Sequence, residues 1–90
     1  MGFGMDFIYT LQNEIVSELG SRRAAHVNVA VLPSIIMDFR KMILDADDGQ
    51  VVIEDYNLED GSLSLSFKGQ KQGDSPQITE IKINGRQVDL

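Results

Sequence analysis

The 90-residue sequence predicts an α+β domain in which two helices cover one face of a mostly antiparallel sheet of about four to five strands. Apolar residues in two segments of the first half recur at every third or fourth position, which is typical of amphipathic helices. The second half alternates apolar and polar residues, as half-buried strands do. We expect the order helix, strand, helix and then four strands, within one domain over residues 1–90.

The first helix is expected over residues 6–19. An aspartate at its first position suits the N-cap, and Gly20 suits the position after the last turn, where φ is positive. The apolar stripe of this helix consists of Ile8, Leu11, Ile15, Val16 and Leu19. Residues 1–5 precede it as a flexible apolar leader interrupted by glycine. We expect Phe3 and Met5 in this leader to contact a second subunit of a homo-oligomer.

A strand is expected over residues 26–32, followed by the second helix. Val27, Val29 and Val31 alternate with other residues, and β-branched side chains at period two favour a strand with one buried face. Pro33 suits the first turn of the second helix, because its missing N–H has no intrahelical partner there. The apolar stripe of that helix consists of Ile35, Ile36, Phe39, Met42 and Ile43. The strand is expected to join the sheet through this helix, as a right-handed crossover if it runs parallel.

Two strands are expected next. The first covers residues 50–56, and the second is centred on Leu63, Leu65 and Phe67, which alternate with serines and should therefore be buried on one face. Residues 68–77 contain two glycines and a proline, so we expect a mobile loop there.

The last two strands are expected over residues 78–83 and 86–90. They flank Asn84 and Gly85, and an Asn-Gly pair is the strongest short signal for a hairpin because both residues reach positive φ readily. In the register of this hairpin, the residues that face each other are Ile81 with Val88 and Thr79 with Leu90.

Composition excludes several classes of function. A net charge of −6 and a pI near 4.5 argue against direct binding of nucleic acid through its phosphates and against an anionic membrane surface. The absence of cysteine excludes disulfides, thiolate catalysis and cysteine-based metal sites. No apolar run approaches the roughly 18 residues that a bilayer span requires. We expect a cytoplasmic protein.

Seven carboxylates, and no lysine or arginine, lie between Met42 and Phe67. Charges of one sign raise the local potential for a basic partner, and those that follow a helix C-terminus lie where the macrodipole disfavours them. The competing interpretation is an ordinary solvated surface, since turns favour aspartate for conformational reasons. The acidic block consists of Asp45, Asp47, Asp48, Glu54, Asp55, Glu59 and Asp60.

We expect no metal and no cofactor. Counted from Asp45, Gly49 falls at the fifth position of a calcium loop and Tyr56 at the twelfth. An EF-hand requires glycine at the sixth position and glutamate at the twelfth, so the pattern fails. A single histidine without cysteine does not make a zinc site.

A second group of candidate residues is cationic. Arg22, Arg23 and His26 follow the first helix, and arginine forks bind phosphate or carboxylate in a bidentate manner. Lys68 and Lys71 come from the glycine-containing 68–73 segment, which does not fit the phosphate-binding loop pattern. The competing interpretation of the arginines is that they complement the dipole at the helix C-terminus.

No catalytic constellation is recognisable, so we expect the chain not to be an enzyme. The one histidine has no serine in a G-x-S-x-G context to activate. Ser62, Ser64 and Ser66 form a face of small side chains that a partner sheet can approach, provided that their strand lies at an edge.

Two functions therefore follow from the sequence. The first is non-catalytic binding of a protein with a basic surface, as an inhibitor or accessory factor of a nucleic-acid-handling enzyme, by analogy with compact acidic proteins of phages and mobile elements. The alternative is an oligomeric binder of a small anionic ligand such as a nucleotide, through Arg22, Arg23, His26, Lys68 and Lys71.

Overall fold

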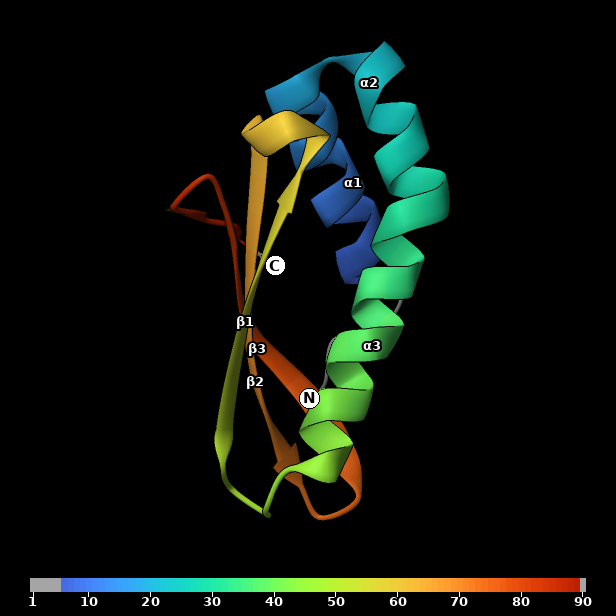
Figure 1. Cartoon of the computed structure of the whole chain (residues 1–90). Coiled ribbons are helices and arrows are strands. Elements are labelled where there is room, and N and C mark those ends of the chain that lie inside the picture. The colour runs from blue at the N-terminus through green and yellow to red at the C-terminus, as the bar shows by residue number, and fades with distance from the viewer. Residues whose placement is uncertain (1–5, 90) are drawn as a thin grey trace.

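The computed structural model describes residues 6–89 as a layer of helices packed on one face of a four-stranded antiparallel sheet (Figure 1). This confirms the α+β class and the placement of the helices on one face of the sheet. The expectations for Phe3, Met5 and Leu90 lie outside the described residues.

Helix α1 spans Asp6–Leu19, as predicted. Gly20 follows with φ of 85°, and its N–H donates to the carbonyl of Val16 at 2.7 Å. Helical backbone then continues without interruption through α2 (Ser21–His26), a π-helical segment (Val27–Val31) and α3 (Leu32–Asp45). The side chains of Gln12 and Asn28 each donate to the other's backbone carbonyl at 3.2 Å, which joins α1 to this second helical arm.

The expected strand over residues 26–32 is wrong, because this segment is helical. Val27 is buried and Val29 is 78% exposed, although period-two alternation would place both on one face. Val27 belongs instead to a helical stripe that begins at Ala24 and continues at Val31 and Ile35, at spacings of three or four residues. The N–H of Leu32 donates to the carbonyl of Val27, five residues earlier, which widens the turn just before Pro33. Pro33 does lie in the first turn of α3, but the crossover from a strand does not exist.

The sheet contains β1 (Val51–Leu58), β2 (Leu63–Gln72), β3 (Ser75–Ile83) and β4 (Arg86–Gln87), in that spatial order. Leu63, Leu65 and Phe67 are fully buried, as their alternation predicted. The ring of Phe67 lies 5.5 Å from that of Phe39 on α3, measured between centroids. Within residues 6–89, each strand pairs only with its neighbours in the sequence, so the sheet is a simple meander.

The expected mobile loop over residues 68–77 is also wrong, because both strands extend through it. Gly69 is buried in β2 at the point where the register with β3 shifts. A Cβ at this position would clash with the Gln77 carbonyl and lie 2.7 Å from Cδ1 of Ile43, so glycine here permits close packing. The hairpin turns at Gly73, whose φ of 61° is the positive value that a tight two-residue turn requires.

The last hairpin turns where the Asn-Gly pair predicted it. Asn84 and Gly85 have φ of 51° and 81°, and the N–H of Val88 donates to the carbonyl of Ile81 at 2.8 Å. This confirms the pairing of Ile81 with Val88. Thr79 has no residue of β2 opposite it, because the register between β2 and β3 shifts at this point.

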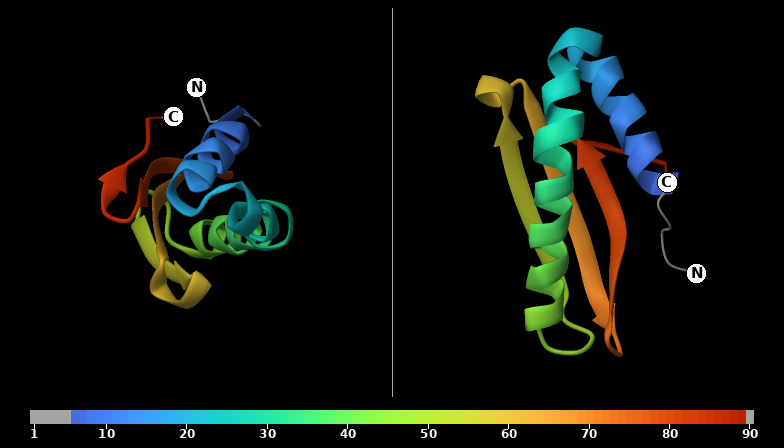
Figure 2. Two further views of the ribbon diagram at one scale, coloured as in Figure 1. Left: turned by 90° about the horizontal axis from the view of Figure 1, so that it is seen from above. Right: turned by 90° about the vertical axis from the view of Figure 1, so that its right-hand side faces the viewer.

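The helices cover the sheet unequally (Figure 2). Helix α3 runs along the sheet, whereas α1 lies beside the first part of the second helical arm and over the side of the C-terminal hairpin. The buried residues form one cluster between the two layers. Among the described residues, the opposite face of the sheet carries no covering element. None of the described helices has the length and apolar character needed to cross a membrane.

Candidate functional site: the acidic edge strand

Strand β1 is the first strand of the sheet and pairs only with β2 within the described part of the chain. Eight residues at about 3.4 Å each make an edge of about 27 Å. The outward N–H and C=O groups of such a strand have no partner in the sheet. We call this side of the molecule, together with the connections that flank it at residues 45–50 and 59–61, the β1 edge.

The acidic block lies along the whole β1 edge rather than in one compact patch. Asp45 ends α3, and Asp47 and Asp48 are exposed in the turn that follows it. Glu59 and Asp60 lie beyond the other end of β1, at the opposite end of the molecule (Figure 1). The remaining two acidic residues, Glu54 and Asp55, are on the strand itself. The seven carboxylates therefore form a line along one edge of the sheet.

The two faces of β1 differ in chemistry. Val51, Ile53 and Asp55 lie on the open face, where Val51 is 48% and Ile53 is 59% exposed. Glu54 and Tyr56 alternate with them and turn toward the helical layer, opposite the buried Phe67 and Leu65 of β2. A partly buried charge on the inner side of an edge strand is a known device against uncontrolled strand pairing. The edge thus presents exposed apolar side chains next to carboxylates.

Asp38 and Tyr56 belong to this site, although the sequence did not single them out. Tyr56 packs on Phe67 with ring centroids 5.7 Å apart, and burial raises the pKa of its hydroxyl. The negative charges of Glu54 and Asp38 raise that pKa further, so the three groups share one seam between β1 and α3. The signal for Asp38 was its spacing of seven residues from Asp45, which puts both on one side of α3. Among the described residues, no three metal-ligating side chains are grouped as a metal site requires.

The negative charge of the β1 edge is largely uncompensated. Within residues 6–89, the one cation within 4.0 Å of any of the seven carboxylates is Arg23, whose Nη2 lies 3.9 Å from Oε2 of Glu59. Both side chains are partly exposed, so this pair contributes little stability. Arg23 therefore lies beside the acidic block, although the sequence analysis placed Arg23 and the acidic residues in two separate candidate sites.

The structure does not bring the cationic candidates together within one molecule. Arg22, Arg23 and His26 are exposed on α2, at one end of the molecule. Lys71 is near the other end, where its Nζ donates to the carbonyl of Leu44 at 3.2 Å and caps the last turn of α3. These cations are thus separated by the length of α3, too far apart to hold one small anion in a single chain.

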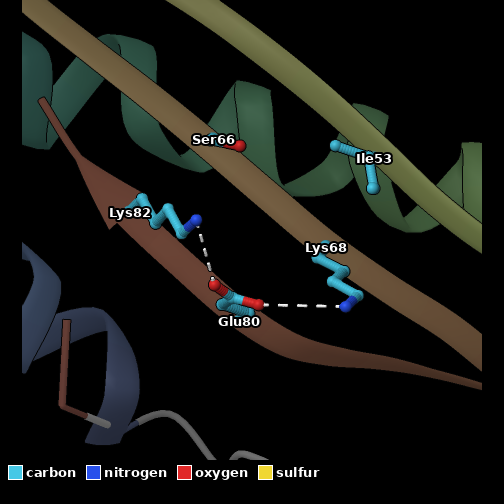
Figure 3. Close-up of a pocket in the computed structure, with 5 residues that line it drawn as sticks. All are labelled: Ile53, Ser66, Lys68, Glu80 and Lys82. Atoms are coloured by element: carbon cyan, nitrogen blue, oxygen red, sulfur yellow. Dashed lines mark ion pairs between the residues drawn. The ribbon is translucent and has the colours of Figure 1, made fainter. Parts of the chain in front are cut away.

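Lys68 lies instead on the open face of the sheet, beside a shallow hollow of about 160 Å³ (Figure 3). Glu80 stands between two lysines in this hollow, with carboxylate oxygens 4.0 Å from Nζ of Lys68 and 3.5 Å from Nζ of Lys82. An anion in the hollow would have to compete with that carboxylate. Ser66 also lines the hollow. Its strand β2 lies between β1 and β3, so the serine face is not at an edge of the sheet, where a partner sheet could have paired with it.

No family model, curated protein or solved structure matches this chain.

Proposed function

We propose that this chain is a non-catalytic protein-binding module that docks through its β1 edge on a basic surface of a partner protein. The observation that carries this proposal is the line of seven carboxylates along an edge strand and its two flanking connections, with one cation nearby among the described residues. Val51 and Ile53 add exposed apolar area to the same edge. Apolar contact supplies affinity, and complementary charge supplies orientation and a fast encounter.

The partner that fits best is a protein that handles nucleic acids. Such proteins bind phosphates with clustered lysine and arginine, and carboxylates spaced along about 27 Å compete for the same groups. The role of this chain would then be that of an inhibitor or accessory factor. Duplex DNA or RNA should displace the chain from such a partner, whereas a neutral polymer of equal size should not.

A pair of matched double variants tests the docking surface. Asp48→Lys with Asp55→Lys reverses two charges on the β1 edge, while Asp74→Lys with Asp89→Lys reverses two exposed charges elsewhere. Both variants have the same net charge. Binding of a fluorescent ten-residue oligolysine, measured by anisotropy, should weaken about tenfold in the first variant and change less than about twofold in the second.

Salt provides the second measurement on the same proteins. Exposed charges are screened over about 10 Å at 0.1 M ionic strength, so oligolysine binding to the unmodified chain should weaken steeply with added salt. If oligolysine binds both double variants equally more weakly than the unmodified chain, net charge alone attracts the probe. That result would refute the β1 edge as the docking surface.

A further inference from the structure

We infer that the β1 edge binds its partner by strand addition: an extended segment with two adjacent basic residues between β-branched ones pairs with β1 and lengthens the sheet. This inference rests on the proposed function and specifies the form of the partner. It concerns the backbone of β1 as well as its charges.

The first argument is the regularity of β1. Its pairing with β2 runs from Val51 with Gln70 to Leu58 with Leu63 without a register shift, and the strand contains no proline. An eight-residue strand of this kind offers a continuous row of free backbone groups, the template on which peptide strands are added. The opposite edge differs, since β4 has two residues and the stretch of β3 that β4 leaves unpaired contains Pro76 and the register shift. Among the described strands, β1 is therefore the edge suited to strand addition.

The second argument excludes a second copy of this chain as the occupant. A two-fold antiparallel pairing places a residue opposite the same residue of the second copy, so a pairing centred at the middle of β1 on Glu54 would place Glu54 opposite Glu54. Like charges directly opposite on neighbouring strands are destabilising. Moving the centre to Asp55 would place Asp55 opposite Asp55, and with either centre the four carboxylates lie within two residues of one another. The same charges that oppose self-pairing favour a basic strand.

The third argument gives the side-chain pattern of the partner. Glu54 turns toward the helical layer near Asp38, and its neighbour Asp55 turns toward the open face. Adjacent residues of an added strand alternate in the same way, so two consecutive basic residues meet one carboxylate on each face. Apolar residues on one side of that pair would lie beside Val51 and Ile53 on the open face, because both precede Glu54 in β1. Basic residues at the two ends would approach the acidic turns that flank β1.

The probe that follows is the amidated peptide Lys-Val-Thr-Val-Lys-Arg-Val-Thr-Val-Lys. Its pattern reads almost the same in both directions, so it fits a parallel or an antiparallel addition. Two control peptides change one property each. In the first, both threonines are replaced by proline, which keeps the charge and removes two backbone N–H groups. In the second, all basic residues are replaced by glutamate.

The experiment is an NMR titration of the full chain with hydrogen exchange of its amides. Free outward amides of β1 should exchange quickly, and they should slow by at least about tenfold when the first peptide binds, because a new ladder protects them. The proline peptide should bind at least about tenfold more weakly, and the glutamate peptide should not bind. Asp55→Lys in the chain should weaken the first peptide, while Asp89→Lys should leave its affinity unchanged.

The outcomes separate this inference from the proposed function. Equal binding of the parent and proline peptides, with fast exchange still at β1, would overturn strand addition and leave charge-based docking intact. Failure of the parent peptide and oligolysine alike would overturn both. Protection of the outward β1 amides without peptide, together with a doubled mass, would show that a second copy occupies the edge and would also overturn the inference.

Discussion

Nη2 of Arg86 lies 3.0 Å from Oε1 of Glu18, so the first residue after the last hairpin turn is tied to the last turn of α1. The same Nη2 lies 2.9 Å from Oε2 of Glu14, one turn earlier. Asn84 in the hairpin turn also donates to Glu18, at 3.0 Å. These contacts join residues about 70 positions apart in the sequence and fix the N-terminal helix on the C-terminal hairpin.

This contact predicts an acid-dependent loss of stability. The hydrogen bond from Arg86, followed by that from Asn84, holds the pKa of Glu18 below its ordinary value of 4.5. Below pH 4.5 the unfolded chain protonates Glu18 before the folded chain does, so the free energy of unfolding falls as pH drops through that lowered pKa. Arg86→Gln should flatten this dependence in denaturant titrations between pH 6 and 3, whereas Arg22→Gln on the exposed face of α2 should not. An unchanged slope in Arg86→Gln would refute the coupling.

The orientation of β2 predicts a sharp contrast between two adjacent positions. Leu65 is fully buried under the helices, so Leu65→Ala should lower the free energy of unfolding by about 2–5 kcal/mol. Ser64 points to the opposite face, and Ser64→Ala should be close to neutral. Chemical denaturation followed by circular dichroism measures both. Similar losses for the two variants would mean that the strand faces the other way.

Gly69→Ala should be destabilising, although alanine is ordinarily no worse than glycine in a strand. The added Cβ would meet the Gln77 carbonyl and the side chain of Ile43, and overpacking of this kind costs about 1–3 kcal/mol. Ser66→Ala, on the open face of the same strand, is the control and should change stability little. A neutral result for Gly69→Ala would contradict the close packing of β2 against α3.

The ionisation of Tyr56 reports on the packing and charges in the seam between β1 and α3. In a Tyr9→Phe background, Tyr56 is the one tyrosine of the chain, and its absorbance should titrate above its ordinary pKa of 10.0. Glu54→Gln should lower that pKa, because it removes a negative charge that opposes the phenolate. Burial is the larger cause of the shift, so part of it should remain. No response to Glu54→Gln would place the carboxylate away from the hydroxyl.

The expected homo-oligomer remains a prediction, and the exposed face of α3 offers a test. Met37 and Leu44 are 68% and 44% exposed and lie seven residues apart, so they share one side of the helix. Light scattering after size exclusion should give a mass above 10.0 kDa, reduced by Met37→Lys with Leu44→Lys or by deletion of residues 1–5. A monomer at high micromolar concentration would refute self-association.

The sequence predicted most elements of the fold but misjudged two segments, and both errors have physical causes. Three valines at period two are also compatible with a helix, because Val27 and Val31 are four residues apart. The apolar stripe from Ala24 to Phe39 has the period of a helix rather than that of a strand. This stripe is recognised only if the helix is taken to begin before Val27. In β2, Gly69 looked like a loop residue, whereas the fold requires glycine there for close packing.

The sequence predicted which residues form the acidic block but not how they are arranged in space. Adjacent residues in the sequence were sufficient to identify the acidic block. Its extension into a line depends on β1 being a full-length edge strand, and strand order is a property of tertiary pairing. The contribution of Asp38 depends on how α3 packs over β1, which no local pattern encodes.

The order of the elements along the chain has a consequence for how the protein folds. The strands are joined by connections of two to four residues, so each pairing closes a short loop at small entropic cost. The helices, in contrast, bury their apolar stripes chiefly against a sheet that is complete only at the last hairpin. During synthesis, Leu11, Ile15 and Phe39 emerge well before the strands that cover them. A partly synthesised chain therefore exposes the apolar stripes of its helices. At this stage we expect aggregation and chaperone binding to compete with folding.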